Sequence, residues 1–242
     1  MNKQIDTKET PIIISLGGSL IAPKRGVINV PFLKKFKILI EKQIKQGKRF
    51  VIIAGGGRLS RTYVDALNKI TTVDEEEQDW LGIHATRMNA HLVKTIFKKY
   101  AQPRINKNPR TKEDLWKHFE NGESVMVAAG WRPGWSTDYV ATILAERFGA
   151  KKLINLSNIT YAYDKDPNKF DDAQKIETTT WSNFRKIVGD KWIPGLNAPF
   201  DPIASSLAEK NKMEVVIIGG SNLENVTKYL EGKQFEGSTI KG

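Results

Sequence analysis

The sequence predicts an α/β fold, a three-layer αβα sandwich built around a mainly parallel central sheet. Short apolar runs alternate with amphipathic stretches along the chain, and glycine-rich turns follow several of these runs. The length of 242 residues suffices for one large domain. Parallel strands need long crossover connections, which the amphipathic stretches supply as helices on both faces of the sheet.

Five apolar runs are candidates for buried strands, because each is short and rich in aliphatic residues. They cover residues 12–14, 50–54, 124–128, 152–156 and 214–218. Six amphipathic stretches predict helices over residues 32–46, 59–69, 79–100, 137–148, 203–210 and 223–230. Together they predict one α/β unit with a soft boundary near residues 149–152.

Two segments are expected to lie outside this unit. Residues 1–10 are polar and of mixed charge, so we interpret them as a disordered tail rather than a signal peptide. Residues 102–111 carry Pro103 and Pro109 and predict an exposed loop. The remainder, residues 11–242, forms the expected single domain.

Composition argues against several classes of protein. The chain has no cysteine, which excludes disulfides and thiolate metal sites and fits a cytoplasmic protein. No apolar run approaches the ~20 residues of a membrane span, so no membrane partner is expected. The net charge of +11 raises the possibility of nucleic-acid binding. The basic residues are dispersed at helical spacing, however, which favours a solvated face and no nucleic-acid partner.

Four glycine-rich turns follow predicted strands. They are Gly17-Gly18-Ser19, Gly55-Gly56-Gly57, the segment 130–138 and Gly219-Gly220-Ser221. Carboxyl ends of parallel strands meet at one edge of a sheet, where glycine backbones and helix amino ends bind phosphates. One such turn is often only a tight turn, but several at the same edge indicate a phosphate site. The chain lacks the P-loop and dinucleotide-binding motifs.

A cation stands one helical turn after the second glycine turn. The guanidinium of Arg61 is placed to return to Gly57 and hold a phosphate through two hydrogen bonds. From this residue alone, an ordinary surface arginine is an equally good interpretation.

Together these motifs resemble the amino acid kinase family, and most closely its archaeal-type UMP kinase branch, from about residue 12 to residue 240. The resemblance rests on the segments 14–19, 54–61, 79–90, 131–138, 158–167 and 237–240. The most specific of them are Asp79-Trp80-Leu81-Gly82 and Pro133-Gly134-Trp135-Ser136-Thr137-Asp138. The glycine loops are shared by the whole family.

The resemblance implies the carbamate kinase-like fold and transfer of the γ-phosphoryl group of ATP to UMP, giving UDP in pyrimidine nucleotide biosynthesis. Residues 11–150 would form the acceptor-binding half and residues 151–242 the ATP-binding half. Mg²⁺ would arrive with ATP, held chiefly by phosphates and water, with no metal site of protein side chains. The family usually forms hexamers built from dimers, so a homo-oligomer is expected.

The resemblance also assigns roles to individual residues. The catalytic residues would be Ser15, Arg61 and Asp138. ATP would contact Gly17, Gly18, Ser19, Gly57, Ser157, Asn158, Tyr163 and Asp166. UMP would contact Gly56, Asp79, Trp131, Arg132, Pro133, Gly134, Trp135, Ser136 and Thr137. Asp79 would accept hydrogen bonds from the ribose, and Asp138 would organise positive groups around the reacting centre.

Three positions depart from the family pattern. Ser15 stands where many members carry a lysine that reaches the transferring phosphoryl group. Ile159-Thr160-Tyr161 replaces the Val-Asp-Gly of the adenine-side hairpin, which affects the turn and the nucleotide fit. Trp131 and Trp135 take positions where smaller or polar residues are usual, so they either stack on the base or narrow the pocket.

Two other functions remain open at this point. The first is a kinase of the same fold with another acceptor, such as isopentenyl phosphate. That branch uses a histidine soon after the triple glycine, whereas this chain has Arg58 and Arg61 there and no histidine before His84. The second is a catalytically weak nucleotide-binding or regulatory protein, which the serine at position 15 and the altered hairpin motivate.

Overall fold

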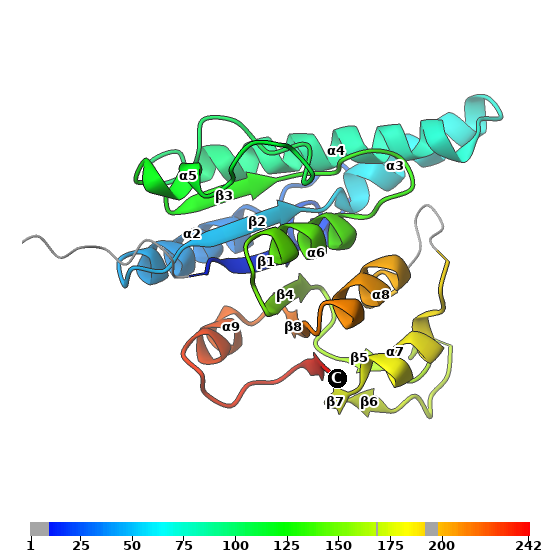
Figure 1. Ribbon diagram of the computed structural model, residues 1–242. Coiled ribbons are helices and arrows are strands. Elements are labelled where there is room, and N and C mark those ends of the chain that lie inside the picture. The colour runs from blue at the N-terminus through cyan, green and yellow to red at the C-terminus, as the bar shows by residue number, and fades with distance from the viewer. Residues whose placement is uncertain (1–9, 168, 192–197) are drawn as a thin grey trace, which may run out of the picture.

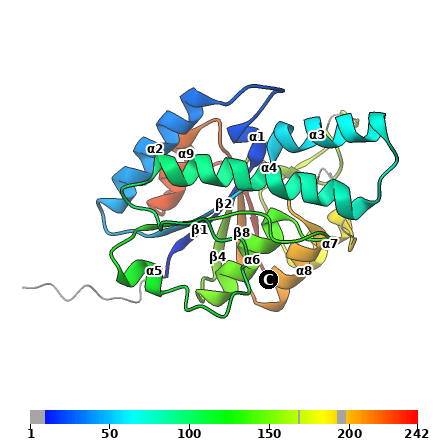
Figure 2. The same cartoon turned by 90° about the horizontal axis from the view of Figure 1, so that it is seen from above.

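A mainly parallel sheet lies between two layers of helices, as the sequence predicts (Figures 1 and 2). The computed structural model describes residues 10–167, 169–191 and 198–242. Nearly all of the expected tail, residues 1–9, lies outside the described residues. Within them, no helix combines the length and the apolar character needed to span a membrane.

The strands of the central sheet include all five predicted ones. Across the described residues the sheet has seven strands, in the order β3 (Val125–Ala128), β2 (Phe50–Ala54), β1 (Ile12–Leu16), β4 (Lys152–Ser157), β8 (Glu214–Gly219), β9 (Ser238–Ile240) and β7 (Thr178–Thr179). The run from β3 to β8 is parallel throughout, with Ile14 of β1 opposite Ile52 of β2. β9 runs antiparallel to β8 and parallel to β7.

The helices divide between the two faces of the sheet (Figure 2). One face carries α1 (Gly18–Ile21), α2 (Val30–Ile44), α4 (Glu75–Ile96) and α9 (Leu223–Leu230). The other carries α5 (Lys117–Glu120), α6 (Thr137–Arg147), α7 (Trp181–Val188) and α8 (Pro202–Lys210). Strand side chains alternate between the two cores: in β1, Ile14 and Leu16 enter the first and Ile13 enters the second.

A helical arm projects beyond the sheet (Figure 1). It consists of α3 (Gly57–Ile70) and the amino-terminal part of α4, which pack against each other. No residue of α3 is buried, although its polar and apolar residues alternate with helical periodicity. The arm therefore exposes apolar side chains such as Tyr63 and Ile70, which are 55% and 81% exposed.

Several helices begin at side-chain caps that the sequence contains. Asp74 accepts a hydrogen bond from the backbone N–H of Glu77 at the start of α4, at 2.9 Å. Ser136 caps α6 in the same way, and Asp201 followed by Pro202 starts α8. Because Ser136 and Asp201 also lie near the carboxyl edge of the sheet, these caps fix two helix amino ends beside the expected site.

The expectation of an exposed loop over residues 102–111 is wrong for part of that segment. Gln102 and Pro109 are buried. The side-chain amide of Gln102 donates to the carbonyl of Val127 at 2.8 Å and accepts from its N–H at 3.0 Å, as a neighbouring strand would. The backbone N–H of Asn106 also bonds the Val127 carbonyl, at 2.8 Å. The segment therefore covers the outer edge of β3.

The hairpin expected on the adenine side is present and extends further than the sequence suggested. β5 (Ala162–Tyr163) pairs antiparallel with β6 (Lys175–Ile176). Ser238 of β9 holds both strands, because its hydroxyl accepts from the N–H of Ala162 at 2.8 Å and donates to the carbonyl of Ile176. The closing strand thus ties the hairpin to the central sheet.

Candidate functional site

A cavity of about 490 Å³ lies at the carboxyl edge of the parallel strands. It is next to β1, where the strand order reverses, with β2 on one side and β4 on the other. In open α/β sheets this is the usual place for a ligand. Its lining includes these predicted site residues: Gly18, Ser19, Gly56, Gly57, Arg61, Asp79, Trp135, Ser136, Thr137 and Asp138.

Two of the glycine turns interlock beside this cavity. A Cβ atom on Gly18 would come within 2.1 Å of the Gly57 nitrogen, and one on Gly57 within 2.2 Å of the Gly18 carbonyl oxygen. Gly57 also has a φ of +63°, which side-chain-bearing residues rarely adopt. Both positions therefore require glycine, and the interlocking places the loops after β1 and β2 against each other.

Two side chains of helix α4 hold the glycine loops by hydrogen bonds to their backbone. The buried amide of Asn89 donates to the carbonyl oxygens of Gly55 and Gly56, at 2.8 and 3.1 Å. Three residues earlier, the hydroxyl of Thr86 accepts from the N–H of Gly130 at 2.8 Å. Sequence reasoning assigned no role to either side chain. The available signal was two polar residues, three apart, on the apolar face of one helix.

Ser15 and Asp138, two of the residues that the resemblance assigns as catalytic, are in contact. The Ser15 hydroxyl donates to Asp138 Oδ1 at 2.7 Å, and the backbone N–H of Asp201 lies 3.3 Å from Oδ2. Burial raises the pKa of Asp138 to about 6, and the neighbouring Asp201 carboxylate adds to this rise, while the Ser15 hydrogen bond opposes it. These described contacts of Asp138 are with a hydroxyl and another acidic residue rather than with positive groups.

Asp201 is a site residue that the sequence analysis missed. Its side chain caps α8 by accepting from the N–H of Ala204, and burial raises the pKa of its carboxyl group. Asp201-Pro202 is a recognisable helix start, but its position in the sequence is remote from every glycine turn. Only the fold brings it to Asp138, so spacing along the chain held no signal for this contact.

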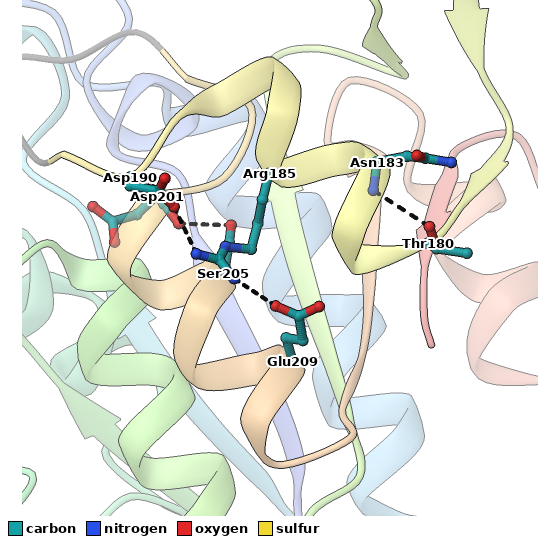
Figure 3. A network of polar contacts seen from close by, with 7 residues as sticks. All are labelled: Thr180, Asn183, Arg185, Asp190, Asp201, Ser205 and Glu209. Carbon is teal, nitrogen blue, oxygen red and sulfur yellow. Dashed lines mark hydrogen bonds and ion pairs between the residues drawn. The ribbon is translucent and has the colours of Figure 1, made fainter.

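A clamp between α7 and α8 supports the helix that carries Asp201 (Figure 3). Arg185 of α7 pairs with Glu209 of α8 at 2.7 Å and with Asp190 at 2.6 Å. The Ser205 hydroxyl donates to the Asp201 carbonyl at 2.7 Å, within α8. The two ion pairs of Arg185 therefore tie α7 to the later part of α8, while the Ser205 bond lies within the first turn of α8.

The predicted UMP loop is attached to α4 through Asp79. Its Oδ2 atom accepts a hydrogen bond from the backbone N–H of Gly134 at 2.6 Å. Gly134 has a φ of +82°, so the loop turns where glycine is favoured, directly after Pro133. Asp79 is also one of the residues that line the cavity. A single carboxylate therefore orders the loop and borders the cavity.

Aromatic side chains form a stack along the same loop. Trp135 lies between Trp131 and Tyr139, with ring centroids 6.3 and 4.1 Å away, and the Arg132 guanidinium lies 4.3 Å from the Trp131 ring. Of the two tryptophans, Trp135 lines the cavity. Arg87 of α4 holds the stack by donating to the carbonyl of Trp131 at 3.0 Å. With its ring engaged on both sides, Trp135 is placed to limit the width of the cavity.

The predicted ATP residues form a second group, next to the cavity. Ser19 and Ser157 both donate to Asn158 Oδ1, at 3.2 and 3.4 Å, which joins the loops after β1 and β4. The N–H of Gly17 bonds the carbonyl of Leu156 at 2.8 Å. Tyr163 lies on β5 and Asp166 in the turn that follows it, so both belong to the hairpin rather than to the cavity lining.

The described lining of the cavity carries more negative than positive side chains, while two helix amino ends contribute positive potential. Of the described residues that line it, Arg61 is the one cation, against the carboxylates of Asp65, Asp79 and Asp138. The amino ends of α3 and α6 border it and direct positive potential inward. The geometry thus suits phosphates held by backbone N–H groups, with an added cation to balance the carboxylates.

Comparison with known proteins places this site in a family. The model of the amino acid kinase family matches residues 10–219. The chain is 31% identical to the uridylate kinase of Hyperthermus butylicus over 96% of this chain and 98% of that protein. It is 34% identical to that of Thermoplasma volcanium, over 92% and 93%.

Solved structures agree with the sequence matches. The crystal structure of uridylate kinase from Archaeoglobus fulgidus superposes with a TM-score of 0.78 and 28% identity, covering 95% of this chain and 99% of that one. The UMP kinase of Bacillus anthracis shares the fold, with a TM-score of 0.76 at 17% identity over 96% of each chain. On its sequence, its fold and the position of its glycine loops, this chain belongs to the amino acid kinase family.

Proposed function

We propose that this protein is a UMP kinase, which transfers the γ-phosphoryl group of ATP to UMP and releases UDP and ADP. The observation that carries the proposal is the cavity at which the interlocked glycine loops meet the Asp79-anchored loop. The relatives named uridylate kinase match this chain nearly end to end, which favours UMP over other acceptors. It also favours an enzyme over a weak nucleotide-binding protein.

The proposed chemistry depends on alignment and charge neutralisation. The acceptor is already an ionised phosphate, so the reaction needs no strong general base. The loops containing Gly18 and Gly57 would hold the transferring phosphates between donor and acceptor. Arg61 borders the cavity and would neutralise the charge that develops there, partly replacing the family lysine that Ser15 displaces.

We propose Mg²⁺ as the accompanying cation. ATP phosphates and water would be its main ligands, because no group of three or more His, Cys, Asp or Glu side chains able to hold a metal ion occurs among the described residues. The excess of carboxylates over cations in the described lining also favours a nucleotide that arrives with its metal. When bound, Mg²⁺ would neutralise charge on the ATP phosphates.

Three broader properties extend the same proposal. The protein would act in pyrimidine nucleotide biosynthesis in the cytoplasm. It would form a homo-oligomer, by family resemblance a hexamer built from dimers. The exposed Tyr63 and Ile70 of α3 support a subunit contact at this arm, since isolated monomers seldom expose several large apolar side chains on one element.

A coupled ADP-release assay with Mg-ATP and each nucleoside monophosphate tests the proposal. We expect turnover with UMP to exceed that with AMP, GMP and CMP. Arg61→Ala should lower kcat/KM on the order of 100-fold, because it removes the cation bordering the reacting phosphates. Arg58→Ala, on the same helix but outside the cavity lining, is the matched control and should stay within about threefold. Nucleotide binding without turnover for any acceptor would contradict the proposal.

A further inference from the structure

A second hollow, of about 620 Å³, lies at the opposite edge of the sheet. Its walls are the amino ends of β1, β4 and β8, together with the connection between α9 and β9. None of its lining residues borders the cavity at the carboxyl edge. The kinase reaction proposed above therefore leaves this hollow without a role.

The floor of the hollow is apolar and shaped by aromatic rings. Ile154 of β4 is buried, and Leu230 at the end of α9 is partly buried beside it. Tyr229 and Phe235 pack edge to face, with ring centroids 4.9 Å apart and planes at 74°. Gly232, with a φ of +71°, turns the chain between these two rings. The result is a concave, largely apolar surface of the kind that lines small-molecule sites.

The rim of the hollow is basic. It carries Lys151, Lys152, Lys233 and Lys241, against one carboxylate, Glu214. Lys152 lies 3.3 Å from Glu214, so these two charges balance.

Of the three remaining rim lysines, one forms an ion pair among the described residues and two do not. Lys233 pairs with Glu231, which is outside the lining, at 2.7 Å. Among the described ion pairs, Lys151 and Lys241 have no carboxylate partner; Lys151 is 3.3 Å from the carbonyl of Asn211. Like charges gathered around one hollow repel each other, and a bound anion would relieve that repulsion.

Tyr229 adds a hydrogen-bonding group to this combination. Burial raises the pKa of its hydroxyl group, and the negative charge of Glu214 adds to the rise, so it stays protonated. No hydrogen bond joins this hydroxyl to another residue in the described part of the chain. It is available as a donor to a molecule bound in the hollow, which Tyr229 lines.

We propose that this hollow is a binding site for a small organic anion, with an apolar aromatic body and a phosphate as its charged group. The body would pack on Ile154 and the Tyr229–Phe235 pair, and the phosphate would lie between Lys151 and Lys241. Size agrees with this assignment, because pockets of about 300–1,000 Å³ hold such molecules. The proposal rests on the amino edge alone and is independent of the kinase function.

Calorimetric titration of the full-length protein with 1-naphthyl phosphate tests the site. We expect saturable binding that weakens at least tenfold in the double variant Lys151→Gln/Lys241→Gln. Lys35→Gln/Lys112→Gln, two exposed lysines elsewhere, is the charge-matched control and should bind as the wild type does. Because all four lysines are exposed, unfolding should not obscure the result, and equal Tm values would verify this.

Further titrations test whether the probe binds in this hollow, and whether both its aromatic body and its phosphate contribute to the affinity. Arg61→Ala should leave the affinity unchanged; a loss there would place the probe in the kinase cavity and overturn the proposal. Inorganic phosphate and 1-naphthol should each bind at least tenfold more weakly than 1-naphthyl phosphate. Equal affinity for either fragment, absence of binding to the wild type, or indifference to the double lysine variant would also overturn it.

Discussion

The two edges of the central sheet carry hollows of similar size and opposite construction. At the carboxyl edge, glycine backbones and helix amino ends surround a cavity whose described charged side chains are mostly carboxylates. At the amino edge, charged lysine side chains surround an apolar floor. In the two proposals above, the first edge would bind phosphate through fixed backbone dipoles, whereas the second would do so through exposed lysine side chains.

This difference follows from strand direction. Where parallel strands end, the chain turns into helices whose amino ends point back toward the sheet, which brings N–H groups together. Where the strands begin, helix carboxyl ends arrive and favour cations such as lysine. The carboxyl edge therefore tolerates little change in its backbone, while the amino edge is expected to be permissive.

The strongest test of this contrast is a pair of glycine substitutions. Gly18→Ala should destabilise the protein by about 3 kcal/mol or more and lower kcat/KM at least ~100-fold, because its Cβ would overlap the Gly57 nitrogen. Gly232→Ala, at the amino edge, has open space around its Cβ and should cost only about 1 kcal/mol for its positive φ, with activity retained. Urea unfolding and initial rates measure both. Equal effects would remove the distinction between the edges.

A second test compares a partly buried charge at the carboxyl edge, Asp138, with an exposed charge at the amino edge, Lys241. Asp138→Asn should lower kcat on the order of 100-fold and yet stabilise the fold by ~1–2 kcal/mol at pH 8. The pKa of Asp138 is raised to about 6 in the folded state, above its unfolded value. The protonated group therefore favours folding, and this contribution is lost as pH rises through about 6. The full shift would be worth about 3 kcal/mol, but the carboxylate partly faces water in the cavity.

The pH dependence of the stability gain shows whether it comes from the raised pKa of Asp138 or from a general effect of the substitution. The stability gain of Asp138→Asn over the wild type should shrink as pH falls from 8 to 5, because the wild-type carboxyl group then takes up its proton. Lys241→Gln, the comparison at the amino edge, should change stability by less than about 0.5 kcal/mol across this range. Thermal unfolding at several pH values measures both variants. A pH-independent gain would argue against the raised pKa as its cause.

The smallest effect is expected within the carboxyl edge itself. Asp79→Ala removes a charged acceptor from the Gly134 N–H, so the loop loses its anchor while the glycine loops keep theirs. KM for UMP should rise about tenfold, with kcat within about threefold. Glu76→Ala, an exposed acidic residue on the same helix, is the control and should leave KM unchanged. A fall in kcat alone would show that Asp79 acts on the phosphates rather than on the acceptor.

The sequence predicted the features that depend on local pattern. Strand and helix positions followed from apolar runs and periodicity, and the glycine turns marked the correct edge of the sheet. Ser15 and Asp138 were assigned to one centre by family resemblance, and they lie in hydrogen-bond contact. Their individual roles, like those of the other site residues, remain predictions.

The parts that escaped prediction depend on contacts between distant segments. Asp201 reaches Asp138 across 63 positions, and neither residue carries a local signal of the other. The short strands β5, β6 and β7 are two residues each, too short to show any periodicity. Asn89 received no role of its own in the sequence, because its partners are two glycine carbonyls more than thirty positions away.

Residues 102–106 cover the outer edge of β3 and so block the pairing of another chain with this edge strand. An edge strand presents unpaired N–H and C=O groups that another chain can use as a template, which leads to aggregation. Here the Gln102 amide and the Asn106 backbone already occupy the groups of Val127 that a foreign strand would need. We therefore expect the Gln102 side chain to oppose aggregation at high concentration. Gln102→Leu should form fibrous or amorphous precipitate, while the protein that stays folded in solution still binds nucleotides.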